Sequence, residues 1–291
     1  MKPAPFDYYA PTSLEEALAT LSDLGYSGKV LAGGQSLIPA MNFRMARPAA
    51  LVDLSKVKEL AYIRPTDNGG VAIGTMTRDS VVEENPYVQE KFPLVIETIK
   101  YIAHRQIRNA GTFGGAIAHA DPAAQLPALA VALKAKLLIK NKNGERWVDA
   151  ADFFVGPFMT VLEPEDMLVE ILLPPMAPRS AGSYKQVSRQ KGGYAQAATI
   201  CVVTLDESGR CKEARVVLFS VGETPILSAH AAKTLVGQVP TAELIASVSA
   251  VVAKDEIDPG TDIHGTSDYR HHLVDVLVRR SLTEAFERAR K

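Results

Sequence analysis

Two double-glycine segments decide how this sequence folds: Ala32-Gly33-Gly34-Gln35-Ser36 and Gly111-Thr112-Phe113-Gly114-Gly115-Ala116. Glycine adopts positive φ and lets a backbone approach a ligand closely. Two such segments that converge would offer amide donors to a pyrophosphate, with the Ser36 and Thr112 hydroxyls beside them or capping helices. A single Gly-Gly pair is usually only a turn. The presence of two predicts a dinucleotide site.

The surrounding residues resemble a known family. Neither the Rossmann pattern G-x-G-x-x-G nor the P-loop with its Lys-Ser/Thr pair is present. The first segment instead resembles the first flavin-binding segment of the FAD subunits, or medium subunits, of molybdenum hydroxylases of the carbon monoxide dehydrogenase and xanthine dehydrogenase type. The residues that carry this likeness are LAGGQSLIP at 31–39, Arg44, and LVDL at 51–54.

The likeness continues along nearly the whole chain, with the motifs in the family's order. The second glycine segment, within QIRNAGTFGG at 106–115 and followed by HADPAA at 119–124, is similar to the family's second flavin-binding segment. Further matches stand where the family begins its third domain and in its C-terminal helix: SYKQ at 183–186, GYA at 193–195, Tyr269-Arg270 and Arg279-Arg280.

The resemblance implies which residues contact FAD. Tyr194 would approach the isoalloxazine, and a cation at Lys185 would stabilise the anionic reduced flavin. The family often has Asn or Ser where Ala116 stands, and an acidic ribose contact where Gln125 stands. It requires no catalytic residue or metal ligand in this chain. The implied cofactor contacts are Leu31, Ala32, Gly33, Gly34, Gln35, Ser36, Leu37, Ile102, Ala103, Gly111, Thr112, Gly114, Gly115, Ala116, Asp121, Gln125, Leu168, Lys185 and Tyr194.

Composition narrows the class of protein. The 291 residues suffice for two or three domains, and 47% are apolar, enough for a substantial core. Lys+Arg 32 against Asp+Glu 33 gives a net charge of −1, which does not favour nucleic acid as a partner. No apolar stretch approaches the roughly 18 residues of a membrane-spanning helix. The N-terminus lacks the apolar core of a signal peptide, so we expect a soluble, cytoplasmic protein without an integral membrane segment.

Cysteine usage limits the redox chemistry of the chain. Only Cys201 and Cys211 are present. An iron–sulfur cluster usually takes four cysteines, and structural zinc sites take close pairs of ligands. Cys201 lies in an apolar run and is predicted to be a buried core thiol. His119 and Asp121 have no apparent third metal ligand. Electrons for any redox work must therefore come from another chain.

Hydrophobic periodicity predicts an α+β protein in three parts. The capping pattern Thr12-Ser13-Leu14-Glu15 opens a helix that ends near Gly25. Strands at 29–32 and 50–54 flank a short helix at 37–43, which makes a small βαβ unit. The second part has hairpins around 67–70 and 143–144, helices at 77–84, 94–102 and 126–133, and a closing strand at 168–173. After a proline-rich linker at 174–178 come strands at 183–188, 195–205 and 215–221, helices at 227–235, 242–252 and 269–289, and an exposed loop at 257–268.

Combined with the resemblance, this predicts a two-part FAD-binding domain of the PCMH type at 1–176, with subdomains at about 1–57 and 58–176. A C-terminal α+β domain of the CO dehydrogenase flavoprotein type follows at 177–291, with a three-stranded antiparallel sheet and a helical bundle. The resemblance implies that a large partner subunit holds the molybdenum–pterin cofactor and a small iron–sulfur subunit holds two [2Fe–2S] clusters, in a dimer of heterotrimers. Electrons would pass from these clusters through FAD to an external acceptor.

Two other hypotheses remain open at this point. The first is a self-contained FAD-dependent oxidase or reductase, for which the region of His119 is the only candidate site of a base or flavin attachment. The second is a nucleotide-binding protein without redox function, whose glycine segments hold a molecule such as CoA. Flavin absorbance separates the nucleotide-binding hypothesis from both redox hypotheses. Co-purifying molybdenum and iron separate the electron-transfer subunit from the self-contained oxidase or reductase.

Overall fold

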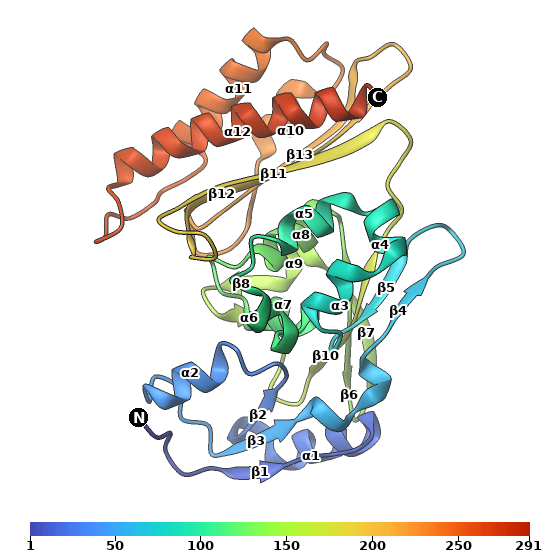
Figure 1. Ribbon diagram of the computed structural model, residues 1–291, viewed down its shortest axis with the longest axis vertical. Helices are drawn as coiled ribbons and strands as arrows, with labels where there is room; N and C mark the ends of the chain where they lie inside the picture. The colour runs from blue at the N-terminus through green and yellow to red at the C-terminus, as the bar shows by residue number, and fades with distance from the viewer.

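The computed structural model describes residues 1–291 and shows three units stacked along the long axis of the molecule (Figure 1). The elements of the N-terminal unit span residues 7–60, those of the central unit residues 63–173, and those of the C-terminal unit residues 180–289. The C-terminal helix α12 crosses the end of the molecule opposite to the N-terminal unit. Both glycine segments lie in the N-terminal and central units.

The N-terminal unit has the predicted βαβ arrangement. Its three strands are parallel in the order β1-β3-β2, and the short edge strand β1 was not predicted. Short 3-10 turns follow α1 and β3. The elements are β1 (Asp7–Tyr9), α1 (Leu14–Leu24), β2 (Gly28–Leu31), α2 (Leu37–Asn42) and β3 (Ala50–Asp53), with the 3-10 turns Gly25–Ser27, Leu54–Lys56 and Lys58–Leu60.

Helix α1 begins one residue later than the capping pattern suggested. Ser13, not Thr12, is the N-cap: its hydroxyl accepts a hydrogen bond from the Glu16 N–H at 3.2 Å. The Glu16 carboxylate in turn accepts from the Thr12 N–H at 2.7 Å. The helix ends at Gly25, whose φ of 50° suits a glycine. These caps satisfy free N–H groups at the start of the helix and fix its position on the sheet.

The central unit contains a five-stranded antiparallel sheet in the order β4-β5-β10-β6-β7. The predicted closing strand, β10, lies in its middle because both predicted hairpins pair with it, one on each side. A separate two-stranded hairpin, β8–β9, lies beyond α9. The strands are β4 (Ile63–Pro65), β5 (Val71–Gly74), β6 (Lys136–Asn141), β7 (Gly144–Asp149), β8 (Phe154–Gly156), β9 (Met159–Thr160) and β10 (Met167–Leu173).

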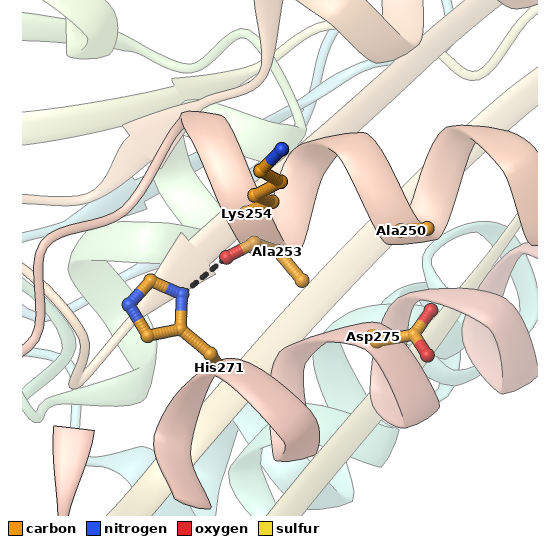
Figure 2. A pocket seen from close by; sticks show the side chains of 5 residues that line it. All are labelled: Ala250, Ala253, Lys254, His271 and Asp275. Carbon is orange, nitrogen blue, oxygen red and sulfur yellow. Dashed lines mark hydrogen bonds between the residues drawn. The ribbon is translucent and has the colours of Figure 1, made fainter. Parts of the chain in front are cut away.

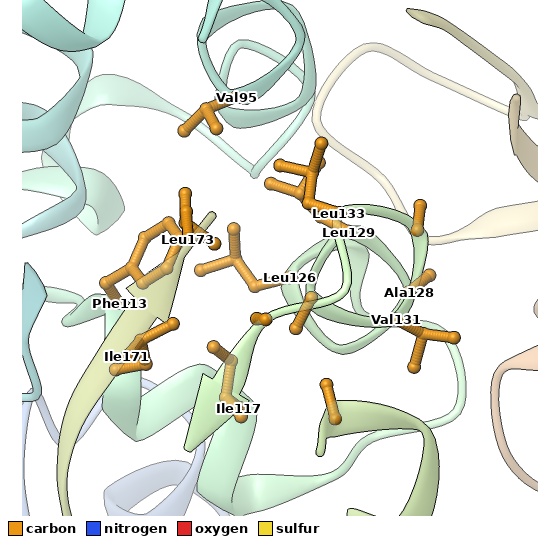
Figure 3. Close-up of a cluster of buried hydrophobic side chains, with 14 of the residues drawn as sticks. Val95, Phe113, Ile117, Leu126, Ala128, Leu129, Val131, Leu133, Ile171 and Leu173 are labelled. Carbon is orange, nitrogen blue, oxygen red and sulfur yellow. The ribbon is translucent and has the colours of Figure 1, made fainter. Parts of the chain in front are cut away.

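Seven helices complete the central unit, and α8 is buried along its whole length. It packs in a central core of 32 buried side chains, in which Phe113 and Ile117 of α7 meet Leu126 of α8 and Ile171 of β10 (Figure 3). The expected helices at 77–84 and 94–102 are both shorter in the structure. The helices are α3 (Asp79–Glu84), α4 (Pro86–Lys91), α5 (Pro93–Ile99), α6 (Arg105–Ala110), α7 (Phe113–His119), α8 (Gln125–Ala132) and α9 (Ala150–Phe153).

The C-terminal unit is an antiparallel sheet covered on one face by three helices. It has four strands in sequence order, one more than predicted, because the two-residue strand β14 pairs with β13. Residues 257–266 lie between α11 and α12, mostly exposed, as predicted. The elements are β11 (Ser180–Ser188), β12 (Ala195–Leu205), β13 (Cys211–Phe219), β14 (Ile226–Leu227), α10 (Ala229–Leu235), α11 (Ala242–Asp255) and α12 (Ser267–Ala289).

The two faces of the C-terminal sheet belong to different cores. Tyr184, Ile200 and Phe219 are fully buried in the central core, against α5 and α8. Cys201 and Val216 point the other way, into a second core with α11 and α12. The central and C-terminal units are therefore joined by continuous hydrophobic packing. No helix of the chain combines the length and apolarity needed to cross a membrane.

Candidate functional site

The two glycine segments, residues 32–36 and 111–116, pack directly against each other. A Cβ atom added to Gly33 would overlap the carbonyl oxygen of Ala110 and lie 2.9 Å from the Cα of Gly111. A Cβ atom added to Gly115 would overlap the Thr112 hydroxyl and lie 3.0 Å from the Cβ of Ala32. Such distances are shorter than van der Waals contact, so this approach of two backbones requires glycine. The predicted convergence is present.

The first segment presents unpaired amide donors. The backbone N–H groups of residues 32–36 make no hydrogen bond within the chain. Two carbonyl groups of the segment are engaged: Gly33 accepts from the Gln35 side chain at 3.1 Å, and Gly34 accepts from the Ile38 N–H at 3.1 Å. Gly34 has φ 71°, the left-handed region, and Ser36 makes no capping bond to α2. Successive free N–H groups in such a turn form a concavity suited to an anion.

The second segment plays a different part from the one predicted. Gly114 and Gly115 are not in a loop with positive φ but in the first turn of α7. Their amides are already used: the Gly114 N–H donates to the Thr75 carbonyl at 3.1 Å, and the Gly115 N–H donates to the Thr112 hydroxyl at 3.2 Å. A Cβ atom on Gly114 would overlap Thr75. The expectation of an amide bed from both segments was therefore wrong, because these glycines serve close packing.

Ile102 and Ala103, which the family resemblance implied as cofactor contacts, form a tight turn just before α6. Ala103 has φ 40°, unusual for a residue with a Cβ atom. Arg108 holds this turn, because its Nη1 donates to the Ile102 carbonyl at 3.0 Å and its Nε pairs with Glu83 at 3.0 Å. The β11–β12 connection rests on the same turn: a Cβ atom on Gly192 would lie 2.9 Å from the Ala103 carbonyl oxygen.

That connection also brings Tyr194 to Asp121, two residues that the family resemblance implied. Asp121 accepts from the Ala123 N–H at 2.8 Å. Desolvation, followed by the Asp121 carboxylate, raises the pKa of the Tyr194 phenol, although the residue is 65% exposed. Next to them, His119 lies 5.2 Å from Phe158, measured between ring centroids, and desolvation lowers its pKa.

Three residues of the predicted set are engaged elsewhere. The Lys185 ammonium group forms an ion pair with Glu284 of α12. Side chains alternate along a strand, so Lys185 points away from the face that carries Tyr184 and the central unit. Gln125 is only 7% exposed, and its side-chain amide contacts Gln186 of β11 at 3.5 Å.

The remaining member, Leu168, packs its side chain into the central core. Its neighbour Val169 accepts a hydrogen bond from the Thr75 N–H at 3.0 Å, and Thr75 accepts from the Gly114 N–H. The strand that carries Leu168 therefore supports the second glycine segment from behind.

Sequence reasoning missed two residues under the second segment. The Arg78 guanidinium donates to the Ala110 carbonyl, and the Asp79 N–H donates to the Gly111 carbonyl at 3.2 Å. The Asp79 side chain is 3% exposed, and desolvation raises its pKa to about 7. The available signal was the pair of adjacent charges Arg78-Asp79, four residues after the apolar strand 71–74.

A depression between α11 and α12 is unrelated to this site (Figure 2). The His271 ring contacts the Ala253 carbonyl, and the charged lining residues Lys254 and Asp275 form no ion pair with each other. It is lined by Ala250, Ala253, Lys254, His271 and Asp275.

Comparison with known families covers almost the whole chain. Residues 4–176, more than half of the sequence, match the model described as "FAD binding domain in molybdopterin dehydrogenase". Residues 182–285 match the "CO dehydrogenase flavoprotein C-terminal domain". The chain is 38% identical to the 6-hydroxypseudooxynicotine dehydrogenase complex subunit alpha of Paenarthrobacter nicotinovorans, covering 100% of this chain and 97% of that one. It is also 38% identical to the carbon monoxide dehydrogenase medium chain of Hydrogenophaga pseudoflava, covering 99% of each.

Solved structures agree with these sequence matches. Carbon monoxide dehydrogenase from Hydrogenophaga pseudoflava contains a chain that superimposes with a TM-score of 0.95 at 36% identity, covering 99% of both chains. Quinoline 2-oxidoreductase from Pseudomonas putida contains one with a TM-score of 0.94 at 33% identity, covering 100% of both. This agreement in sequence and fold establishes the relationship: the chain belongs to the FAD-binding medium subunits of the molybdenum hydroxylases, a family of oxidoreductases.

Proposed function

We propose that this chain holds FAD at the paired glycine segments and passes electrons from the [2Fe–2S] clusters of a small partner subunit to an external acceptor. A large partner subunit with a molybdenum–pterin cofactor would oxidise the substrate. The observation that carries the proposal is the row of unpaired N–H groups at residues 32–36, held against a second segment by contacts that only glycine permits. A diphosphate accepts hydrogen bonds from such a row.

The chain's own residues divide the work of binding. The amides of residues 32–36 would take the diphosphate, with Leu31, Leu37 and the Ser36 hydroxyl beside them. The turn at Ile102 and Ala103, which Arg108 holds, would support the isoalloxazine, and Tyr194 and Asp121 would shield it from solvent. When bound, FAD supplies the change between one-electron and two-electron transfer. No residue of this chain needs to act as acid or base on the organic substrate.

The dependence on partner chains follows from the cysteines. Cys201 and Cys211 are both buried and free, and burial raises the pKa of each thiol to about 11. Two protonated, separated thiols cannot hold an iron–sulfur cluster, which takes several thiolates. Relatives are named as a complex subunit and as a medium chain, which supports assembly with other subunits, here proposed as a dimer of heterotrimers.

The division into domains is part of the same proposal. We place the FAD-binding domain at 1–176, with subdomains at about 1–57 and 58–176, and the C-terminal domain at 177–291. The separate sheets support this division, and so do the ranges of the two family models. The shared central core means that the two domains stabilise each other.

Flavin binding tests the first half of the proposal. The purified chain, freed of ligand and titrated with FAD, should gain bound flavin absorbance at one FAD per chain. The substitution Gly34→Ala forces a side chain into left-handed backbone at φ 71° and should weaken binding by roughly tenfold or more, since such strain costs about 1–3 kcal/mol. Gly209→Ala is the matched control, because Gly209 has φ 80° in a remote turn with no neighbour within 4 Å.

Equal loss of affinity in both variants, or no FAD binding by the parent chain, would contradict this half.

The second half is tested by metal analysis of the complex purified through a tag on this chain. Molybdenum and iron in fixed ratio to FAD support the electron-transfer role. Turnover of an organic substrate by the isolated chain would support the alternative, a self-contained FAD oxidase or reductase.

A further inference from the structure

Asp79 occupies an unusual position under the candidate site. Gly111 lies between it and the first glycine segment: a Cβ atom on Gly111 would be 2.7 Å from Asp79 Oδ2, while one on Gly33 would be 2.9 Å from Gly111 Cα. Asp79 is 3% exposed, and its buried Oδ1 has no hydrogen-bond partner. A polar atom left unpaired in a folded protein requires an explanation.

The neighbouring arginines do not pair with Asp79. Arg78, just before α3, donates to the Ala110 carbonyl. Arg108 of α6 is held by both carboxylate oxygens of Glu83, at 3.0 and 3.5 Å, and by the Ile102 carbonyl. These two cations and the Glu83 anion are the charges that act on Asp79, and α4 and α5, which also pack on α3, contribute none.

A buried carboxylate without a paired cation is strongly disfavoured, whereas the neutral acid is tolerated. The geometry therefore favours a protonated Asp79 that fills the space below Gly111. Ionisation would require water at the buried Oδ1, while Oδ2 lies against Gly111 of the second glycine segment. It would also place a negative charge beneath the bed proposed for the diphosphate.

We propose that Asp79 is a positioning residue of the flavin site: its neutral carboxyl group seats the second glycine segment against the first, and its ionisation loosens both segments and weakens FAD binding. This inference rests on the proposed function. It assigns to Asp79 no contact with the cofactor and no step in electron transfer, only the placement of Gly111 and Thr112.

The test is the pH dependence of FAD affinity, measured with the full chain between pH 5.5 and 8.5. In the parent protein the dissociation constant should rise with pH, approaching roughly tenfold per pH unit once Asp79 titrates. Asp79→Asn keeps the shape of the side chain and stays neutral. Its affinity for FAD should equal that of the parent at low pH, and the rise of the dissociation constant with pH that Asp79 causes should be absent. Asp152→Asn, at an exposed residue of α9, is the control and should follow the parent.

His119 lies at the same site and could also make FAD binding depend on pH. The test is therefore the difference between the pH profiles of the parent and of Asp79→Asn, and not the parent profile alone. Identical profiles in the two proteins overturn the inference while leaving FAD binding intact. Absence of FAD binding in every variant overturns the proposed function and this inference with it. A third variant, Asp79→Ala, removes the seat without adding charge and should bind FAD more weakly than Asp79→Asn at low pH.

A measurement on the unmodified chain covers the case in which Asp79→Asn does not fold. Carbon-13 NMR of labelled aspartate carboxyl groups reports the titration midpoint of Asp79 with and without FAD. Because binding and ionisation are linked, FAD must lower the acid dissociation constant of Asp79 by the factor by which ionisation weakens binding, so the midpoint rises. A midpoint that FAD does not move overturns the inference.

Discussion

At the scale of single residues, the site depends on glycines whose lack of a Cβ atom permits close backbone contacts. Gly33, Gly114 and Gly115 each leave out a Cβ atom that would overlap a neighbour, and Gly111 leaves out one that would press on Asp79. The absence of these Cβ atoms lets the two chain segments approach each other, while the amides of residues 32–36 have no hydrogen-bond partner in the chain. Small side chains and free backbone donors together define what the site accepts, namely an anionic group that fits close to the backbone.

The buried acid at position 79 makes a separate prediction about stability. Burial raises its pKa from the ordinary 3.8 to about 7 in the folded chain, so the folded state retains a proton that the unfolded state releases. Stability relative to Asp79→Asn is therefore greatest near pH 4 and falls as pH rises toward 7, by at most about 1.4 kcal/mol per pH unit. Urea denaturation of the ligand-free proteins at pH 4.5, 5.5 and 6.5 measures this difference. A difference that stays constant or grows in the opposite direction would rule out the neutral acid.

At the scale of elements, strand alternation decides which side chains of β11 reach which partner. Tyr184 faces the central core, while Ser183 and Lys185 face α12, where both contact Glu284. Arg288 of α12 also pairs with Glu97 of α5 at 2.6 Å and so ties this helix to the central unit. The polar contacts of β11 and α12 thus stabilise the C-terminal unit and its attachment to the central unit.

Lys185→Met is predicted to leave the flavin unaffected. Lys185 and Glu284 are about a third exposed, and exposed or half-exposed pairs contribute up to about 1 kcal/mol. The variant should lose no more than this in its free energy of unfolding, and its flavin reduction potential should match that of the parent. Potentiometric titration of the FAD-loaded chain is the measurement. A large fall in the potential would show that the ammonium group leaves Glu284 and acts on the flavin after all.

At the scale of the whole molecule, the central core runs through the boundary between the central and C-terminal units. Tyr184, Ile200 and Phe219 of the C-terminal sheet share it with α5 and α8. Arg215 of β13 adds polar contacts by donating to the carbonyls of Val131 and Ala132 at the end of α8. We therefore expect the two units to unfold together.

Phe219→Ala tests this cooperativity. The ring is fully buried, so its truncation should lower the free energy of unfolding by about 3–5 kcal/mol. The single tryptophan, Trp147 in β7, lies in the central unit and reports that unit by fluorescence. The fluorescence transition should shift as far as the transition seen by circular dichroism. A Trp147 transition unaffected by the variant would mean that the units unfold independently.

Local patterns predicted most of this architecture, because they act within a few residues. Gly25 ends α1, and Asn68-Gly69 marks the β4–β5 hairpin. Both signals act locally and do not depend on contacts with distant residues. The strands of β10 and β12 were readable from continuous apolar runs. The edge strands β1 and β14 were missed, since two or three residues carry no periodicity.

The site was predictable only in part, for reasons that lie in its tertiary contacts. The sequence signals that Gly114 and Gly115 are close to other groups. It does not show that Gly114 meets Thr75, or that Gly115 meets Ala32 and the Thr112 hydroxyl that caps α7. Likewise, the partners of Lys185 and Gln125 come from elements about 100 and 60 residues away, so no local pattern names them.

The crowding of Gly192 against the Ala103 carbonyl has a consequence for how the molecule tolerates change. Any larger side chain at position 192 must lift the tip of the β11–β12 connection, and Tyr194 would rise with it. A residue some eighty positions from the nearest glycine segment would thus set how closely Tyr194 covers the proposed flavin site. We expect substitutions at this position to speed dissociation of the proposed cofactor, although the residues that would bind it are unchanged.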